Sequence, residues 1–267
     1  MGSSTDTGET MVQIVVCVKQ VYDIGGLKVD PKTRSLITER VERKISDFDK
    51  NALEEALRMK EKQGGSVIAI TLGSPTASDS LREALNMGVD EAYLIDVGDM
   101  VELDARVTAD LIAAAIKRIG EFDLVICGEA SVDMYAAQVG PRIAERLGIP
   151  LVSHARSVSL SGSVVTAERD LEDAYETVEI STPLLLTVTK EINEPRIPKI
   201  TMVIKASKKT AKVLNAQDLG IQLTPSVRVL KALAPVTERK RETIGGKTGE
   251  ITESLVRQLL RDGVVGG

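Results

Sequence analysis

The sequence predicts an α/β fold with a doubly wound, mostly parallel sheet, and three observations lead to this class. Four short runs of apolar, largely β-branched residues are typical of strands covered on both faces. Longer stretches with helical periodicity alternate with these runs, which is the order of a parallel sheet. From residue 151 the pattern changes to strict alternation, which indicates added antiparallel strands. We therefore expect a Rossmann-like sheet with an antiparallel extension and an extended C-terminal arm.

The first half of the chain alternates strands and helices. The predicted strands are residues 12–18, 66–72, 92–97 and 123–127. The predicted helices are residues 49–63, 75–87, 101–119 and 134–147. Ser74 and Pro75 suit the N-cap and first position of the second helix. Pro141 is tolerated only in a first helical turn, so the fourth helix should begin near residues 136–140.

The remaining elements interrupt or extend this pattern. Residues 27–38 are predicted to form a hairpin about Asp30-Pro31, between the first strand and the first helix. The later strands, which we expect to be antiparallel, are residues 164–169, 177–181 and 184–189. Regular patterning fails after about residue 205 and returns as an amphipathic helix at residues 252–261. This division gives a disordered tail or cloning remnant at 1–11, an α/β domain at 12–205 and an arm at 206–267.

Composition excludes several functional classes. The 267 residues carry 34 Lys and Arg against 39 Asp and Glu, for a formal net charge of −5, whereas nucleic-acid-binding domains are usually basic. Two cysteines, Cys17 and Cys127, and one histidine, His154, offer little to a metal site or a His-based triad. No apolar run reaches the ~18 residues of a membrane span, and residues 1–10 resemble no secretory signal. We expect a cytoplasmic protein with a binding or carrier role.

Residues 128–141, with the sequence GEASVDMYAAQVGP, are the strongest candidate for a ligand site. They follow the fourth strand at its carboxyl end, where open α/β sheets bind ligands. Small residues before Pro141 would leave main-chain N–H groups at a helix N-terminus open to an anion. Asp133 and Gln138 could bond ribose or phosphate oxygens. The alternative is a capped helix with nothing bound.

We expect three other segments, two at strand ends and one just before a helix, to converge with this loop on one crevice. They are Cys17, residues 46–49 and residues 71–74. Cys17 could equally be a small core residue, and Asp49 could simply be a helix N-cap. The run Gly245-Gly246-Lys247-Thr248 lacks the leading glycine and preceding strand of a phosphate-binding loop, and no dinucleotide fingerprint follows the first strand.

Taken in order, five sequence blocks resemble the β subunit of electron-transfer flavoproteins. They are residues 15–21 (VVCVKQV), residues 47–56 (DFDKNALEEA), Asp133 with residues 138–141 (QVGP), residues 193–196 (NEPR) with Lys205, Lys208 and Lys209, and residues 218–220 (DLG). The resemblance covers residues 11–265. Each block is weak alone, but all five in order are specific.

The resemblance implies a heterodimer with an α subunit that carries a redox-active FAD. The domain at 12–205 would hold an adenine nucleotide, and the arm at 206–267 would pack on the α subunit. Implied cofactor-binding residues are Cys17, Ser46, Asp47, Phe48, Asp49, Leu72, Ser131, Asp133, Ala137, Gln138, Val139 and Gly140. Implied partner-docking residues are Asn193, Glu194, Pro195, Arg196 and Ile200, which would meet dehydrogenases and a quinone oxidoreductase. No side chain would be catalytic, and no metal is expected.

The nucleotide is either AMP, a structural ligand, or a second FAD that accepts hydride from NADH in members that bifurcate electrons toward ferredoxin. Met134 and Tyr135 replace the acidic residues common in AMP-type members, and Gln138 with Val139 is shared with bifurcating members. Met134 and Ala136 differ from the Gly and Thr usual in the latter. We therefore favour FAD, with AMP as the alternative, and an NADH-oxidising enzyme only if the protein bifurcates.

Two rivals of similar fold remain. An adenylating enzyme would need a Ser-Gly-Gly-x-Asp-Ser type of loop after the first strand, and residues 17–23 (CVKQVYD) do not provide one. A non-redox adenine-nucleotide-binding protein would lack both the docking loop and the long arm.

Overall fold

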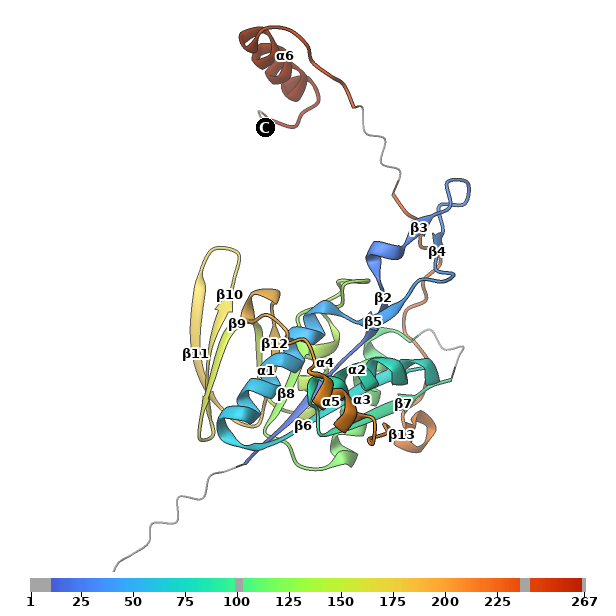
Figure 1. Ribbon diagram of the computed structural model, residues 1–267, viewed down its shortest axis with the longest axis vertical. Helices are drawn as coiled ribbons and strands as arrows, with labels where there is room; N and C mark the ends of the chain where they lie inside the picture. The colour runs from blue at the N-terminus through green and yellow to red at the C-terminus, as the bar shows by residue number, and fades with distance from the viewer. Residues whose placement is uncertain (1–10, 99–102, 236–240, 266–267) are drawn as a thin grey trace, which may run out of the picture. The chain divides into compact units, whose positions relative to one another are not determined.

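The computed structural model describes residues 11–98, 103–235 and 241–265 (Figure 1). The chain separates into two compact units. The first comprises the chain up to Lys28 together with Leu36–Ala232, and the second comprises Val29–Ser35 and the chain from Leu233 onward. The predicted ligand site lies within the first unit.

The first unit is built on one large sheet. Among the described residues nine strands form it, in the spatial order β11 (Tyr175–Ser181), β10 (Val164–Asp170), β9 (Leu151–Ser161), β12 (Leu184–Val188), β8 (Leu124–Gly128), β1 (Val12–Cys17), β6 (Gly65–Gly73), β7 (Glu91–Asp96) and β13 (Lys212–Asn215). The four parallel strands predicted from apolar runs are β1, β6, β7 and β8. In β1, Ile14 and Val16 face one core while Val15 and Cys17 face the other. Burial on both faces explains why this strand is a continuous apolar run.

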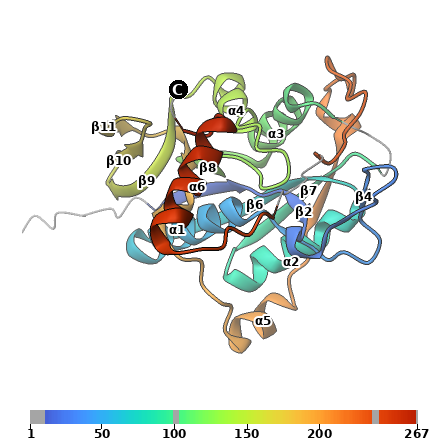
Figure 2. The same cartoon turned by 90° about the horizontal axis from the view of Figure 1, so that it is seen from above.

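Helices cover both faces of the sheet, as Figure 2 shows. α1 (Asp47–Gln63) and α2 (Ser78–Met87) bury their apolar residues on one face. α3 (Ala105–Ile119) and α4 (Val139–Leu147) bury theirs on the other. This arrangement confirms the doubly wound, mostly parallel α/β class.

The helix starts differ from prediction by a few residues. α1 begins at Asp47 with Ser46 as N-cap, so the interpretation of Asp49 as the N-cap is wrong. A 3₁₀ turn, η2 (Pro75–Ala77), precedes α2. α4 begins at Val139, inside the window that Pro141 set.

α3 begins where a carboxylate caps it. Asp104 accepts a hydrogen bond from the Val107 N–H at 2.9 Å, which satisfies one of the free donors of the first turn. The helix therefore starts at Ala105, later than predicted. Residues 101 and 102 of the predicted range lie outside the described residues.

The antiparallel extension is confirmed in β10 and β11, but the prediction for residues 184–189 is wrong. β10 pairs antiparallel with both β9 and β11. β12 instead pairs parallel with both β8 and β9. The reason is a reversal of β9 near His154, which has a positive φ of 57°. Leu151, at the start of β9, pairs with Leu185 near the start of β12. The Leu160 carbonyl, near the other end of β9, accepts a hydrogen bond from Gln63 at the C-terminal end of α1.

β13 was not predicted. It pairs parallel with β7 at the sheet edge, and Lys212 bonds Glu91 there at 2.7 Å. Four residues with mostly exposed side chains leave no apolar run to detect. The first unit therefore continues to Ala232.

Several short elements accompany the large sheet, and the hairpin among them has its turn, Val29–Ser35, in the second unit. β2 (Gln20–Tyr22) pairs with β5 (Arg43–Ile45), and β3 (Lys28–Val29) pairs with β4 (Leu36–Ile37) as the predicted hairpin. In the hairpin turn, the Asp30 carboxylate accepts from the Lys32 and Thr33 N–H groups at 2.7 and 2.9 Å. The other short elements are η1 (Ile24–Gly26), η3 (Lys190–Ile192), α5 (Ile200–Ala206) and η4 (Ala216–Leu219).

The second unit carries the last helix, α6 (Thr248–Arg261), which starts four residues before the predicted range. Glu250 in its first turn accepts from the Lys247 N–H at 3.2 Å. In the same unit Arg34 donates to the Ala234 carbonyl at 2.6 Å. In the described part of the chain, no helix combines the length and the apolar character needed to cross a membrane.

Candidate functional site

The carboxyl ends of β1, β6 and β8 meet at one edge of the sheet. Val16 pairs with Ile126 of β8, and Cys17 pairs with Ile70 of β6. The first turn of α1 and the loop of residues 129–138 close on this edge, as the hydrogen bonds below establish. We call this region the carboxyl-edge site.

Asp49 ties three of these segments together. Its carboxylate accepts from the Lys19 N–H at 2.8 Å and from the Gly128 N–H at 3.1 Å. The residue is 7% exposed. Burial raises the pKa of Asp49 to about 7, against the lowering effect of the two N–H donors and the Lys19 charge. Asp133 also raises it. Asp49 therefore joins the ends of β1 and β8 to α1.

Gly128 is required by this packing. A Cβ at this position would lie 2.6 Å from the Phe48 Cβ and 2.7 Å from the Asp49 Oδ1. Backbone and side chains of α1 thus approach the end of β8 as closely as a glycine allows.

Lys19 is a site residue that the sequence analysis missed. Its ammonium group bonds both Asp133 carboxylate oxygens at 2.8 Å and the Ser131 hydroxyl at 3.3 Å. Partial burial would raise the pKa of Asp133, but the hydrogen bonds from Lys19 and Ser131 outweigh it and lower that pKa. The detectable signal was a lysine two residues after the strand end at Cys17. Lys19 fixes the loop that carries both predicted polar contacts.

The first turn of α1 packs against the same loop. The buried Ser46 hydroxyl accepts from the Val132 N–H at 3.3 Å. Phe48 and Tyr135 form an edge-to-face pair with ring centroids 5.8 Å apart, and Tyr135 donates to Glu129 at 2.9 Å. These contacts bring residues 46–48 against the loop of residues 129–138.

Asp47 and Leu72, two of the predicted cofactor-binding residues, make their contacts with other parts of the chain. Asp47 is half-exposed and pairs with Lys44 at 3.1 Å. Leu72 is half-buried and packs with the apolar residues under α3 and α4.

The start of α4 has the features of an anion-binding helix end. Gln138 is its N-cap, makes no capping bond with its side chain, and accepts from Arg142 at 3.1 Å. No acidic residue lies in the first turn. Ala137 is exposed and has a positive φ of 52°, and Val139 is half-buried. An uncapped helix N-terminus favours negative charge.

Gly140 has a packing role in this helix. A Cβ there would lie 2.8 Å from the Thr187 Cγ2, so the residue lets α4 sit on β12. Its small size therefore serves helix–strand packing.

The two cysteines lie near the carboxyl ends of the adjacent strands β1 and β8. Both Cys17 and Cys127 are buried free thiols. Their mutual hydrogen bond and burial raise the pKa of the Cys127 thiol well above its ordinary value. Within the described ranges, no cluster of three or more acidic, histidine or cysteine residues is arranged to hold a metal.

The predicted docking residues follow η3 and lie along α1. Asn193 donates to the Asn51 carbonyl and to Glu55, each at 3.0 Å. Arg196 donates to Glu54 at 2.7 Å and also pairs with Glu61. Both polar side chains therefore contact the protein's own helix.

The apolar docking residue behaves differently. Ile200, at the start of α5, is 77% exposed. Ile197 and Ile204 are also exposed, at 91% and 61%. Glu194 is exposed and Pro195 half-buried, and the Glu194 carbonyl accepts from Arg58 at 3.3 Å.

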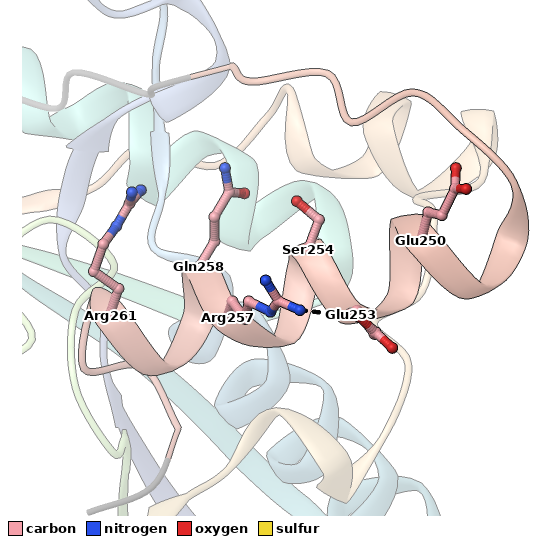
Figure 3. A pocket seen from close by; sticks show the side chains of 6 residues that line it. All are labelled: Glu250, Glu253, Ser254, Arg257, Gln258 and Arg261. Atoms are coloured by element: carbon pink, nitrogen blue, oxygen red, sulfur yellow. Dashed lines mark hydrogen bonds and ion pairs between the residues drawn. The ribbon is translucent and has the colours of Figure 1, made fainter.

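A hollow on α6 lies elsewhere, in the second unit (Figure 3). One helix supplies all of its lining, which is Glu250, Glu253, Ser254, Arg257, Gln258 and Arg261. Arg257 pairs with Glu253 across it at 3.0 Å. A hollow lined by one helix, with every lining side chain polar, lacks the converging loops found at the carboxyl-edge site.

Comparison with known proteins supports a family assignment. The model of the electron transfer flavoprotein domain matches residues 33–219. The electron transfer flavoprotein subunit beta of Thermoanaerobacterium thermosaccharolyticum is 43% identical over 256 residues, covering 93% of this chain and 98% of that protein. The caffeyl-CoA reductase-Etf complex subunit CarD of Acetobacterium woodii is 37% identical over 93% of this chain and 98% of its own length. The acryloyl-CoA reductase electron transfer subunit gamma of Anaerotignum propionicum is 32% identical over 95% and 100%.

Proposed function

Because this chain belongs to the electron transfer flavoprotein β-subunit family, we propose that it is the β subunit of a heterodimer that passes electrons between redox partners. In this proposal it holds an adenine nucleotide at the carboxyl-edge site and docks its partners through residues 193–204. The observation that carries the proposal is the network in which Asp49 and Lys19 join the ends of β1 and β8 to the loop at Asp133.

The residues at this edge fit a nucleotide. The uncapped N-terminus of α4, with Ala137 exposed beside it, suits a phosphate group. Asp133 is exposed enough to accept from a ribose hydroxyl while Lys19 keeps it ionised. The Phe48–Tyr135 pair offers an apolar wall beside the same loop.

We favour FAD over AMP at this site, for the loop residues given above. A bound flavin would supply the hydride and single-electron chemistry, while the chain's own side chains bind and orient it. Two relatives are named for caffeyl-CoA reductase and acryloyl-CoA reductase. Their names support an acyl-CoA dehydrogenase or reductase as a redox partner, with a quinone oxidoreductase, or NADH and ferredoxin in a bifurcating system, as further partners.

The docking proposal combines exposed apolar and basic residues. Ile197, Ile200 and Ile204 are exposed around α5, and Lys199, Lys205 and Lys208 stand exposed among them. An apolar anchor with a charged rim is typical of a transient interface, and the cations would steer an acidic partner surface.

Counting cofactors in the purified heterodimer tests the nucleotide proposal. After denaturation, two flavins per heterodimer are expected by absorbance, and one flavin with one AMP by chromatography would assign AMP instead. One flavin with no second adenine nucleotide would contradict nucleotide binding by this chain.

A substitution at Lys19 tests whether the nucleotide found in that cofactor analysis is bound at the carboxyl-edge site. Lys19→Met frees Asp133 and Ser131, so retention of the β-chain nucleotide should fall about two- to fivefold, the scale of a half-exposed ion pair. Lys117→Met is the matched control, because the Lys117 ammonium donates to the Arg146 carbonyl at 2.8 Å between the ends of α3 and α4. Equal retention of the nucleotide in Lys19→Met and Lys117→Met would contradict a role of Lys19 in nucleotide binding.

A further inference from the structure

The docking segment reaches α5 along α1 with little regular structure of its own. After η3 (Lys190–Ile192), residues 193–199 form no helix or strand. Their position is set by polar contacts with the second, third and fourth turns of α1. These contacts therefore set the path by which the chain enters α5, while Ala206 at the end of α5 is buried and Lys209 donates to the Val89 carbonyl at 2.9 Å.

Glu54 is the centre of these contacts. Its carboxylate accepts from the Arg196 N–H at 3.1 Å, from Arg196 Nε at 2.7 Å and from Arg196 Nη2 at 3.2 Å. Arg58 donates to it from the same helix at 2.8 Å. The Glu54 side chain is 4% exposed. A buried carboxylate is tolerated because these donors satisfy it.

The charges in this cluster hold each other ionised. Burial would raise the pKa of Glu54, but the bonds from Arg196 and Arg58 outweigh it and lower that pKa. Arg196 also bonds Glu61 at 3.1 Å. The Arg196 guanidinium therefore bonds carboxylates of its own chain. We do not assign it a contact with a partner.

An amide pair holds the segment three residues earlier. Asn51 donates to the Asn193 carbonyl at 2.7 Å, and Asn193 donates back to the Asn51 carbonyl at 3.0 Å. Asn51 is buried. Two fixed points, at Asn193 and Arg196, thus precede an exposed Ile197.

We propose that Glu54 is a positioning residue for partner docking: through Arg196 it fixes the segment so that Ile197, Ile200 and Ile204 face a redox partner. The inference rests on the proposed docking function. It assigns Arg196 to the internal contact and leaves the intermolecular contact to the isoleucines and the neighbouring lysines.

Hydrogen exchange on the heterodimer tests the positioning step without any partner. Glu54→Gln removes the charge that holds Arg196, so amides of residues 197–206 should exchange about tenfold faster or more. Arg196→Lys is a second variant. It keeps the positive charge but loses the planar guanidinium that bonds a carboxylate through two N–H groups, so exchange should also be faster in the same residues. Glu176→Gln is the control, because it breaks an Arg169 pair of 2.5 Å at the far edge of the sheet. Unchanged exchange in both test variants would overturn the inference.

Electron transfer separates this inference from the docking function. The assay uses an acyl-CoA dehydrogenase that reduces the wild-type heterodimer. Glu54→Gln and Arg196→Lys should raise the KM for that dehydrogenase about fivefold or more, with kcat within about twofold and nucleotide content unchanged. Ile200→Ala tests docking alone. If it leaves KM at the wild-type value, the docking function fails; if it raises KM while the Glu54 variant does not, only the positioning role fails.

Discussion

At the scale of single residues, the carboxyl-edge site depends on one buried carboxylate and one glycine. Asp49 accepts two main-chain N–H groups from two different strand ends. Gly128 lies against α1 with no room for a Cβ. Both positions are fixed by contacts 30 or more residues away in sequence, at Lys19 for Asp49 and at Phe48 for Gly128.

The buried Asp49 should make stability depend on pH. Its pKa is about 7 in the folded chain against 3.8 ordinarily, so the folded state binds more protons between these values. That stabilisation is present at low pH and is lost as pH rises through 7. From pH 5.5 to 8.5 the free energy of unfolding should fall by about 2 kcal/mol through this residue.

The Asp49→Asn variant should lack this fall, as measured by urea unfolding at the two pH values. Asp47→Asn serves as the control, because Asp47 is half-exposed in the same helical turn. The same pH dependence in wild type and Asp49→Asn would contradict a titrating Asp49.

Gly128→Ala should destabilise the fold. The added methyl group would meet the Phe48 Cβ at 2.6 Å and its carbonyl carbon at 2.9 Å, so backbone must move. We expect a loss of about 2–3 kcal/mol in the free energy of unfolding. Gly249→Ala is the control, since nothing lies within 4 Å of its Cβ position; an equal effect in both variants would argue against the steric explanation.

At the scale of elements, α1 links the two proposed functions. Its first turn carries Phe48 and Asp49 into the carboxyl-edge site, and its next turns carry Glu54 to the docking segment. Three of its acidic residues, Asp49, Glu54 and Glu55, are buried. Burial of charge on a helix is costly unless it is paired, which explains why each of these carboxylates accepts hydrogen bonds from a distant segment.

At the scale of the whole molecule, a net charge of −5 coexists with exposed lysines around α5. Steering by such a local patch is screened by salt. The second unit ends in α6, whose Leu255, Val256 and Leu260 are each exposed by 44% or more. Exposed apolar residues repeated on one helical face suit an interface with another chain.

Charged substitutions on α6 should weaken the heterodimer. Leu255→Glu with Leu260→Glu places two charges on the apolar face, and each buried leucine at an interface contributes about 1.5–3 kcal/mol. Association with the α subunit, measured by sedimentation, should weaken about a hundredfold or more. Glu253→Gln with Arg257→Gln, on the polar side of the helix, should leave it unchanged. Wild-type association of the Leu255→Glu, Leu260→Glu variant would contradict packing of α6 on the α subunit.

The sequence alone determined the local elements. Apolar runs and helical periodicity located β1, β6, β7, β8 and the helices that cover them, because burial on both faces leaves its pattern in consecutive residues. Pro141 placed the start of α4 correctly. The end of each parallel strand was enough to predict which loops would share an edge.

Only the tertiary structure decided what the charged residues do. Lys19 closes the loop at Asp133 from 114 residues away, and Arg196 turns inward to Glu54 across 142 residues. The direction of β12 follows from a reversal of β9 at His154, and β13 joins the sheet without an apolar run. These ion pairs and strand pairings join residues that are far apart in the sequence and meet only on folding. The periodicity of consecutive residues reports burial of a local element and therefore does not predict them.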